Sequence, residues 1–155
     1  MTQPTEPIEF AVAADEITER FTAGSTLSLA VLEELQKICS TNTEAQSLAE
    51  HGRDWWPLAM HWALQGTTPR KPGAVCTPNT TEQVAAIVAV CSTHDLPLTV
   101  AGGRSGVCGS AVPLYGGVVL DVTAMQGIVS VDQVSGIVED RRSLAGQWTS
   151  LCLHV

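Results

Sequence analysis

Residues 74–101 carry the pattern that most constrains the fold of this chain, which is an extended run, a helix and a second extended run. Ala74–Cys76 and Leu98–Ala101 are both short and mostly apolar. Between them, Thr80 and Gln83 have the spacing of a capping box, which predicts that a helix begins there. Because a helix separates the two runs, we expect parallel strands joined by a right-handed crossover.

The helix between these strands has one apolar stripe and a recognisable end. Apolar residues at the spacing of one helix face are Val84, Ile87, Val88 and Cys91. We expect this stripe to be buried. The helix is expected to end at His94–Pro97, since the residue before a proline avoids the helical conformation.

A glycine-rich segment, Gly102–Ser110, directly follows the second strand. Small residues let backbone N–H groups converge on an anion, so the segment is typical of a phosphate cradle. It follows the carboxyl end of a strand, which is where open α/β sheets bind ligands. The spacing of Gly103, Gly106 and Gly109 fits neither a P-loop nor a G-x-G-x-x-G motif. A purely structural turn is the alternative interpretation.

Helices are expected before this block, and strands after it. Apolar residues recur at helical spacing over 26–40, a second helical stretch covers 44–50, and some helix is expected around 15–21. Trp55–Pro57 is interpreted as an irregular packing segment. The later extended runs are Val118–Asp121, Ile128–Val131 and Gly136–Glu139. Asp121 is expected to form a turn, and His51 has no partner at a recognisable spacing.

Composition argues against several classes of function. The formal net charge is −8 and no basic stripe is present, which argues against nucleic acid as a partner. No apolar stretch is long enough for a membrane span, and the polar N-terminus is unlike a signal sequence, so a cytoplasmic location is expected. The five cysteines include no C-x-x-C pair, so neither a disulfide framework nor a metal site is predicted.

Three motifs agree in order and spacing with a known family. They are Pro72–Val84, Leu96–Gly106 and Gly116–Asp121. The segment that contains them resembles the FAD-binding domain of the vanillyl-alcohol oxidase and p-cresol methylhydroxylase (PCMH-type) superfamily, and leans toward glycolate-oxidase-type FAD-linked oxidases and alkyldihydroxyacetonephosphate synthase. The resemblance implies an α+β, PCMH-type FAD-binding fold. This fold would comprise an N-terminal βαβ subdomain and the start of the second subdomain, with helices before them. The fold would be incomplete.

The resemblance also implies a cofactor and the residues that hold it. FAD would be noncovalent, because Arg104 and Ser105 stand where covalent members of the family place a flavin-linked histidine. Ser105 and main-chain amides would donate to the pyrophosphate, with Arg104 as a counter-charge. The expected cofactor-binding residues are Val100, Ala101, Gly102, Gly103, Arg104, Ser105, Gly106 and Val107, together with Pro78 and Thr80. Cys108 is expected to be a small packing residue.

The resemblance divides the chain into three parts. These are an acidic N-terminal arm with helices (1–54), a partial PCMH-type FAD-binding domain (55–139) and an unrelated tail (140–155). Because the family pattern stops after Glu139, a truncated or frame-shifted product is expected. Such a product would bind FAD weakly and have no activity of its own.

The resulting hypothesis is an N-terminal fragment of an FAD-dependent oxidoreductase. Its full-length relative would oxidise a hydroxy acid or act as an alkyldihydroxyacetonephosphate synthase, and a small-molecule substrate is expected for that form alone. No catalytic residue is assigned in this chain. The alternatives are a noncatalytic remnant that acts by association, and a module that binds a phosphorylated ligand other than FAD.

Overall fold

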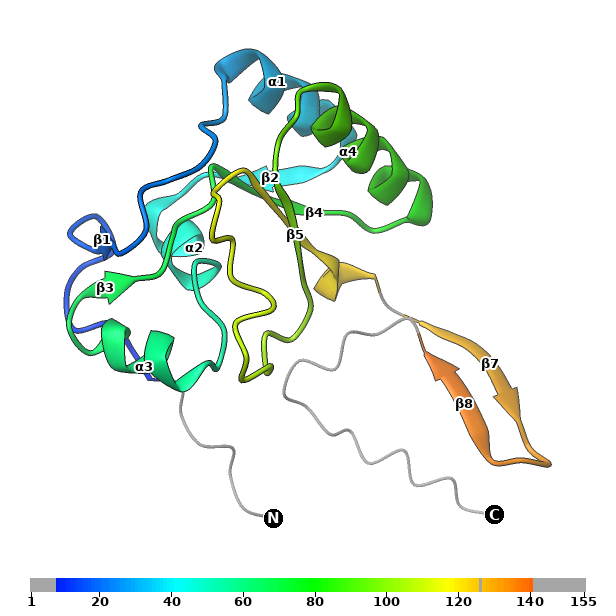
Figure 1. The fold of residues 1–155 in the computed structure, drawn as a ribbon. Coiled ribbons are helices and arrows are strands. Elements are labelled where there is room, and N and C mark those ends of the chain that lie inside the picture. Colours follow the sequence, from blue (N-terminus) through cyan, green and yellow to red (C-terminus); the bar gives the residue numbers. More distant parts are fainter. Residues whose placement is uncertain (1–7, 126, 141–155) are drawn as a thin grey trace.

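The computed structural model describes residues 8–125 and 127–140, and a four-stranded sheet lies at its centre (Figure 1). The strand order is β2 (Ser40–Asn42), β4 (Ala74–Thr77), β6 (Val118–Asp121) and β5 (Leu98–Ala101). β4 and β5 each pair with β6 in parallel, and β2 is antiparallel to β4. The predicted parallel strands on either side of a helix are confirmed, but β6 lies between them.

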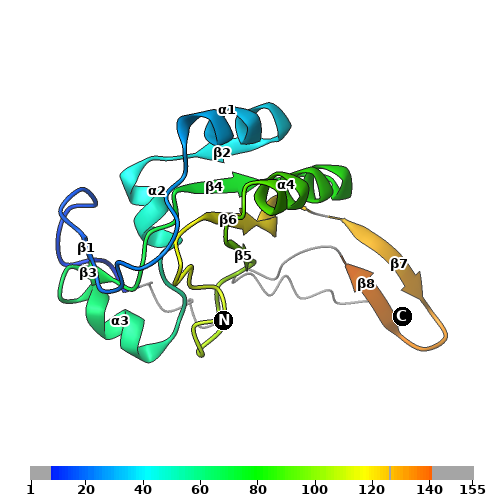
Figure 2. The ribbon, with the colours of Figure 1, turned by 45° about the horizontal axis from the view of Figure 1, so that its top comes forward.

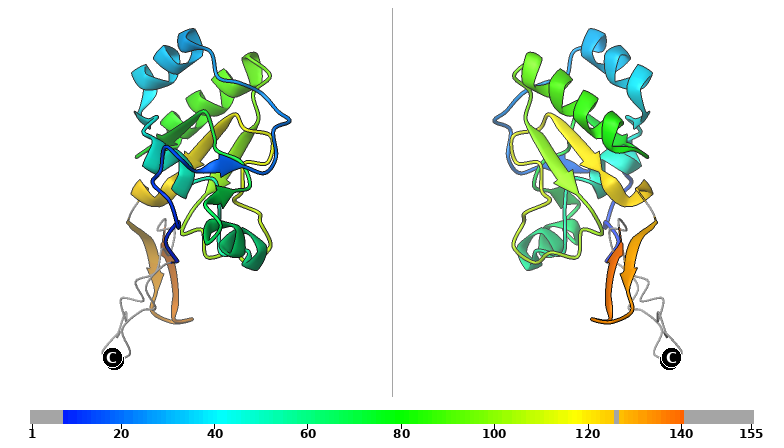
Figure 3. Two further views of the ribbon diagram at one scale, coloured as in Figure 1. Left: turned by 90° about the vertical axis from the view of Figure 1, so that its left-hand side faces the viewer. Right: turned by 90° about the vertical axis from the view of Figure 1, so that its right-hand side faces the viewer.

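Both faces of this sheet are covered. Helices α1 (Leu29–Ile38) and α4 (Thr81–Thr93) lie together over one face (Figures 2 and 3). The core on that side consists of Val31, Leu35, Cys76, Ile87, Val90, Cys91, Val118 and Leu120. The core on the other side consists of Val75, Ala101, Ala111 and Val119, with Leu48 of α2 (Ala45–Glu50) packed against it. Successive residues of β4 and β6 face opposite cores, which explains why the first three residues of each strand are apolar.

Helix α4 begins at the predicted N-cap. The hydroxyl of Thr80 accepts a hydrogen bond from the backbone N–H of Gln83 at 3.3 Å. The Gln83 side-chain oxygen accepts from the backbone N–H of Asn79 at 2.7 Å, one residue earlier than in a standard capping box. The Gln83 amide also donates to the carbonyl of Ile38 at 2.8 Å. This last contact joins the start of α4 to the end of α1.

The buried face of α4 differs from the predicted stripe. Ile87, Val90 and Cys91 are buried, whereas Val88 is 45% exposed. The expectation that Val88 is buried is therefore wrong. Every residue from Val84 to Cys91 is apolar, so periodicity alone could not separate Val88 from Val90. The position of the sheet and of α1 decides which of the two is covered.

The N-terminal segment lacks the helix expected around 15–21. Strand β1 (Thr18–Glu19) pairs in parallel with β3 (Thr67–Thr68) instead. The Glu19 carboxylate accepts from Arg70 at 3.1 Å, and the Ile17 side chain is buried. These contacts are long-range, and local sequence preference does not reveal them.

Trp55–Pro57 is not wholly irregular, because helix α3 (Pro57–Ala63) begins at Pro57. Proline is well tolerated in the first turn of a helix, where its missing N–H would have no partner. The rings of Trp56 and Trp62 pack edge to face at 5.6 Å. The packing part of the interpretation is thus confirmed for Trp56, and the helical start was missed.

The last described residues form a hairpin. After the short 3-10 helix η1 (Val122–Ala124), β7 (Ile128–Asp132) pairs antiparallel with β8 (Ile137–Asp140), and the sequence predicted both strands but not their pairing. The hairpin extends away from the central sheet (Figures 1 and 2). From residue 141 onward, the predicted tail lies outside the described residues. Within 8–125 and 127–140, no helix has the length and apolar character needed to cross a bilayer.

Candidate functional site

The glycine-rich segment begins at the carboxyl end of β5. From there the chain crosses the face of the sheet that lies opposite α1 and α4, and it returns to the start of β6 (Figure 3). Ala111, Val112 and Pro113 are buried, which anchors the second half of the segment. Ser105, Gly106 and Val107 are exposed.

The exposed half of the segment offers unused backbone donors. Within the described part of the chain, the amides of Gly103–Val107 have no hydrogen-bond acceptor. Consecutive free N–H groups in a glycine-rich turn can converge on an anion. We name residues 103–107 the cradle.

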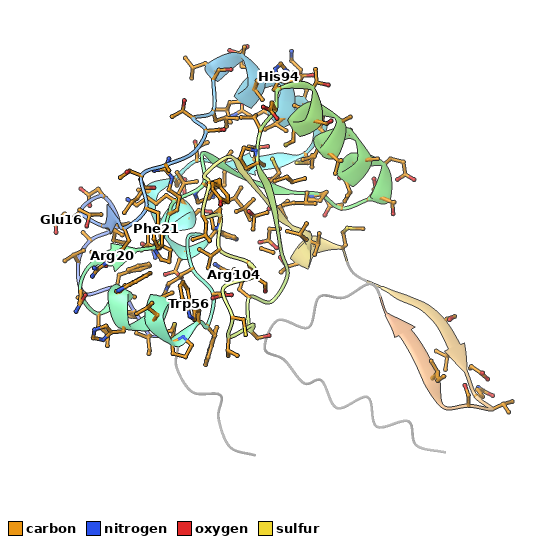
Figure 4. The ribbon with its side chains drawn as sticks, viewed as in Figure 1. Glu16, Arg20, Phe21, Trp56, His94 and Arg104 are labelled. Carbon is orange, nitrogen blue, oxygen red and sulfur yellow. The ribbon has the colours of Figure 1, made fainter. Side chains whose placement is uncertain are left out.

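Arg104 fixes the cradle to the segment that precedes α3. Its φ is +51°, an uncommon left-handed conformation for a residue with a side chain. Its carbonyl accepts from the Trp55 N–H at 3.2 Å, and its guanidinium donates to the Glu50 carbonyl at the end of α2. Burial lowers the pKa of Arg104, and the charges of Asp121 and Glu50 oppose that shift. Arg104 is half-buried, at the position labelled in Figure 4.

Asp121 joins the end of β6 to α2 through His51. His51 Nε2 lies 3.1 Å from Asp121 Oδ2, and His51 Nδ1 lies 2.8 Å from the Ser47 carbonyl oxygen. A carbonyl and a carboxylate only accept, so both contacts are satisfied when the His51 ring carries two protons. Asp121 Oδ1 accepts from the Thr123 N–H at 2.9 Å, which confirms the expected turn. The His51 contact spans 70 residues and left no signal in the sequence.

The Asp121 pair predicts a loss of stability in acid. Burial alone would raise the pKa of Asp121, but hydrogen bonds from His51 and Thr123 lower it overall. A lowered native pKa stabilises the fold above the unfolded value, near 3.8, and this contribution disappears as pH falls through the native value. We expect Asp121→Asn to cost about 1.5–3 kcal/mol at pH 6, and the cost to shrink as the pH is lowered below 3.8. Urea unfolding over a series of pH values measures this change, and a cost that does not depend on pH would contradict it.

A buried charged group borders the cradle. Arg53 and Asp54 are only 6% and 2% exposed. Arg53 pairs with Glu50 at 3.2 Å and lies over the Phe10 ring at 4.3 Å. Asp54 Oδ1 accepts from the Trp56 N–H at 2.9 Å, whereas Asp54 Oδ2 has no donor within the described part of the chain. A pocket of roughly 100 Å³ lies among these side chains and the cradle residues Gly103 and Arg104.

The remaining predicted site residues differ in how they are placed. Pro78 and Thr80 follow β4 at the same edge of the sheet as the cradle, with Pro78 buried and Thr80 capping α4. Val100 is 57% exposed on the outer strand β5. The Ala101 side chain is fully buried in the second core and points into the protein.

The cysteine side chains differ in burial, and Cys108 does not have the burial that the sequence predicted. Cys108 is exposed, so its prediction as a packing residue is wrong; the segment turns outward there. Cys76 and Cys91 are buried, and burial raises the pKa of Cys76 to about 12. Within the described ranges, no three His, Cys, Asp or Glu side chains are grouped to hold a metal ion.

Comparison with known proteins identifies a cofactor class. Residues 72–140 match the family model of the FAD binding domain. The chain is 32% identical over 108 residues to a D-2-hydroxyglutarate dehydrogenase of Stutzerimonas stutzeri, covering 68% of this chain and 21% of that protein. It is 35% identical over 69 residues to a D-lactate dehydrogenase of Anaerostipes hadrus, covering 44% and 14%. The chain thus spans about a fifth or less of these relatives.

Solved structures share the fold. An alkyldihydroxyacetonephosphate synthase matches with a TM-score of 0.66 at 16% identity, over 85% of this chain and 25% of that one. A p-cresol methylhydroxylase matches with a TM-score of 0.56 at 23% identity, over 71% and 22%. The chain therefore has part of the PCMH-type FAD-binding fold, as the sequence motifs implied.

Proposed function

Residues 72–140 belong to the FAD binding domain family, and we propose that this chain holds the pyrophosphate of a noncovalently bound FAD in the cradle. The observation that carries the proposal is the run of five backbone amides, Gly103–Val107, for which residues 8–125 and 127–140 supply no acceptor. A pyrophosphate supplies several strong acceptors, and its charge suits a site built from N–H dipoles.

The cradle relies on backbone groups rather than on a free cation. The Arg104 guanidinium donates to the Glu50 carbonyl and interacts electrostatically with Asp121, so these groups already engage its charge. Ser105 is exposed and can add a hydroxyl donor. Pro78 and Thr80 support the same edge of the sheet. These residues bind and orient the cofactor, and bound FAD supplies the hydride acceptor.

The activity that best fits this site is that of an FAD-linked oxidoreductase acting on a hydroxy acid. Relatives named D-2-hydroxyglutarate dehydrogenase, D-lactate dehydrogenase and glycolate oxidase support it, each at 32–35% identity. We assign the cradle residues, Pro78 and Thr80 to cofactor binding. We assign no described residue to proton or hydride transfer. The chain contributes the pyrophosphate end of the site to this chemistry.

A charge placed in the cradle tests the proposal. Ser105→Asp should weaken FAD binding by about tenfold or more, because a carboxylate beside the pyrophosphate repels it. The asparagine of Ser105→Asn has nearly the same shape as the aspartate but carries no charge. This variant should therefore change the affinity for FAD by less than about threefold. Quenching of FAD fluorescence gives both dissociation constants. Equal effects of the two variants would contradict a pyrophosphate site at Ser105.

Competition separates FAD from other phosphorylated ligands. Adding ADP or inorganic phosphate to the FAD complex should displace FAD only at concentrations well above that of FAD. If either one binds more tightly than FAD, the cradle is a general phosphate site rather than a flavin site.

A further inference from the structure

We propose that His51 is a positioning residue for the cofactor, because its doubly protonated ring anchors the end of α2 to the end of β6 and thereby holds the cradle in place. The proposal rests on FAD binding in the cradle. It makes the affinity for FAD depend on pH, since the anchor has all of its hydrogen bonds only when the ring is protonated. His51 acts through the cradle and needs no contact with FAD.

The first observation is the pair of acceptors that hold the His51 ring. Nδ1 lies 2.8 Å from the Ser47 carbonyl oxygen, one turn back in α2, and Nε2 lies 3.1 Å from Asp121 Oδ2. The side chains of His51 and Asp121 are only 12% and 15% exposed, so water can replace little of their contact. A neutral ring has one N–H and would turn a lone pair toward one of these acceptors. Loss of a proton therefore breaks one side of the anchor.

The second observation is that Glu50, the residue before His51, supports the cradle. The Glu50 carbonyl accepts from the Arg104 guanidinium, and the Arg104 carbonyl accepts from the Trp55 N–H at 3.2 Å. The φ of Arg104 is +51°, a conformation that persists in a residue with a side chain when its surroundings enforce it. Because Glu50 and His51 are adjacent in the chain, a shift of the anchor moves the carbonyl that supports the cradle.

The charges around the anchor assign its response to pH. Besides Asp121 after β6, they are Arg104 in the glycine-rich segment and, near the end of α2, Glu50 and Arg53. Burial would raise the pKa of Asp121, but the hydrogen bonds to it lower the pKa overall, so this carboxylate is ionised at every pH above 3.8. Histidine is the side chain that ordinarily changes charge between pH 5 and 8. Raising the pH through that range therefore acts on the anchor through His51.

The pH profile of FAD binding tests the proposal on the full chain. Raising the pH from about 5.5 to about 8.5 should weaken FAD binding by about fivefold or more, the size of an ordinary coupling between two sites. The coupling is reciprocal, so FAD binding near neutral pH should take up protons. Calorimetry in buffers of different ionisation enthalpy measures this uptake. The pyrophosphate of FAD stays fully ionised over the whole range and adds no slope of its own.

Two variants of His51 separate an anchor from a charge. His51→Gln keeps a side-chain N–H for Asp121 but cannot change its charge, so its FAD affinity should not depend on pH. His51→Leu has no donor and should bind FAD more weakly than His51→Gln at every pH. The matched control is His94→Gln, because His94 Nε2 also faces a carboxylate, Glu34 Oε2 at 3.2 Å, but on the α1 and α4 side of the sheet. It should keep the pH profile of the unmodified chain.

The outcomes separate this inference from the proposed function. FAD binding without pH dependence and without proton uptake overturns the role of His51 and leaves the proposed function standing. A pH dependence that survives in His51→Gln, or equal affinities of His51→Gln and His51→Leu, also overturns it. The proton uptake is measured on the unmodified chain, so it decides the question even where a variant does not fold. If the unmodified chain binds no FAD at any pH, the proposed function fails, and this inference fails with it.

Discussion

Gly117→Ala is expected to lower the free energy of unfolding by about 3 kcal/mol or more. The φ of Gly117 is +69°, and an added Cβ would lie 2.1 Å from the Pro97 carbonyl oxygen. That oxygen accepts the Val118 N–H at 2.9 Å where β6 begins, so relief of the overlap would disturb the sheet. Urea unfolding followed by circular dichroism measures the loss.

Gly136→Ala separates the overlap from the backbone conformation. The φ of Gly136 is +71°, but no atom lies within 4 Å of the added Cβ. Its cost should be about 1–2 kcal/mol, the penalty of a left-handed conformation alone. If the two variants lose equal stability, the contact with Pro97 does not cause the loss at Gly117.

Ile87→Ala is expected to cost about 2–5 kcal/mol, because Ile87 is fully buried between α1 and the sheet. The neighbouring Val88→Ala should change stability by less than about 0.5 kcal/mol, since Val88 is 45% exposed. The same unfolding measurement serves for both variants. A larger loss at Val88 than at Ile87 would show that α4 buries the opposite face.

Most elements of the sheet could be predicted because their signals are local. The apolar runs that became β4, β5 and β6 are short and bounded by proline or glycine, and the Thr80 cap marks the start of α4. The order of the strands was not available from these signals. The insertion of β6 between β4 and β5 depends on pairing between segments distant in the sequence.

The errors outside the sheet have the same origin. Within residues 15–21, Thr18–Glu19 form β1 rather than helix because Thr67–Thr68 offer a pairing partner and Arg70 binds Glu19. Pro57 suggested a break, yet it stands at the first position of a helix, where proline is acceptable.

The candidate site had only one local signal in the sequence. The density of glycines after an expected strand pointed to the segment that contains the cradle, because glycine-rich turns after strands are typical anion sites. The link between His51 and Asp121 joins residues 70 positions apart. The isolation of Asp54 Oδ2 depends on burial by neighbours, and a lone Asp before two tryptophans gives no sign of it.

Two contacts of Arg104 have a consequence for any chimera between related proteins. The cradle is held by Glu50 and Trp55, and both lie before residue 72, where the family match begins. Both groups are main-chain atoms, so a graft that starts at residue 72 keeps these contacts only where the host backbone places a carbonyl and an N–H at the same positions. Transferring residues 50–71 together with the glycines carries that backbone path along with them.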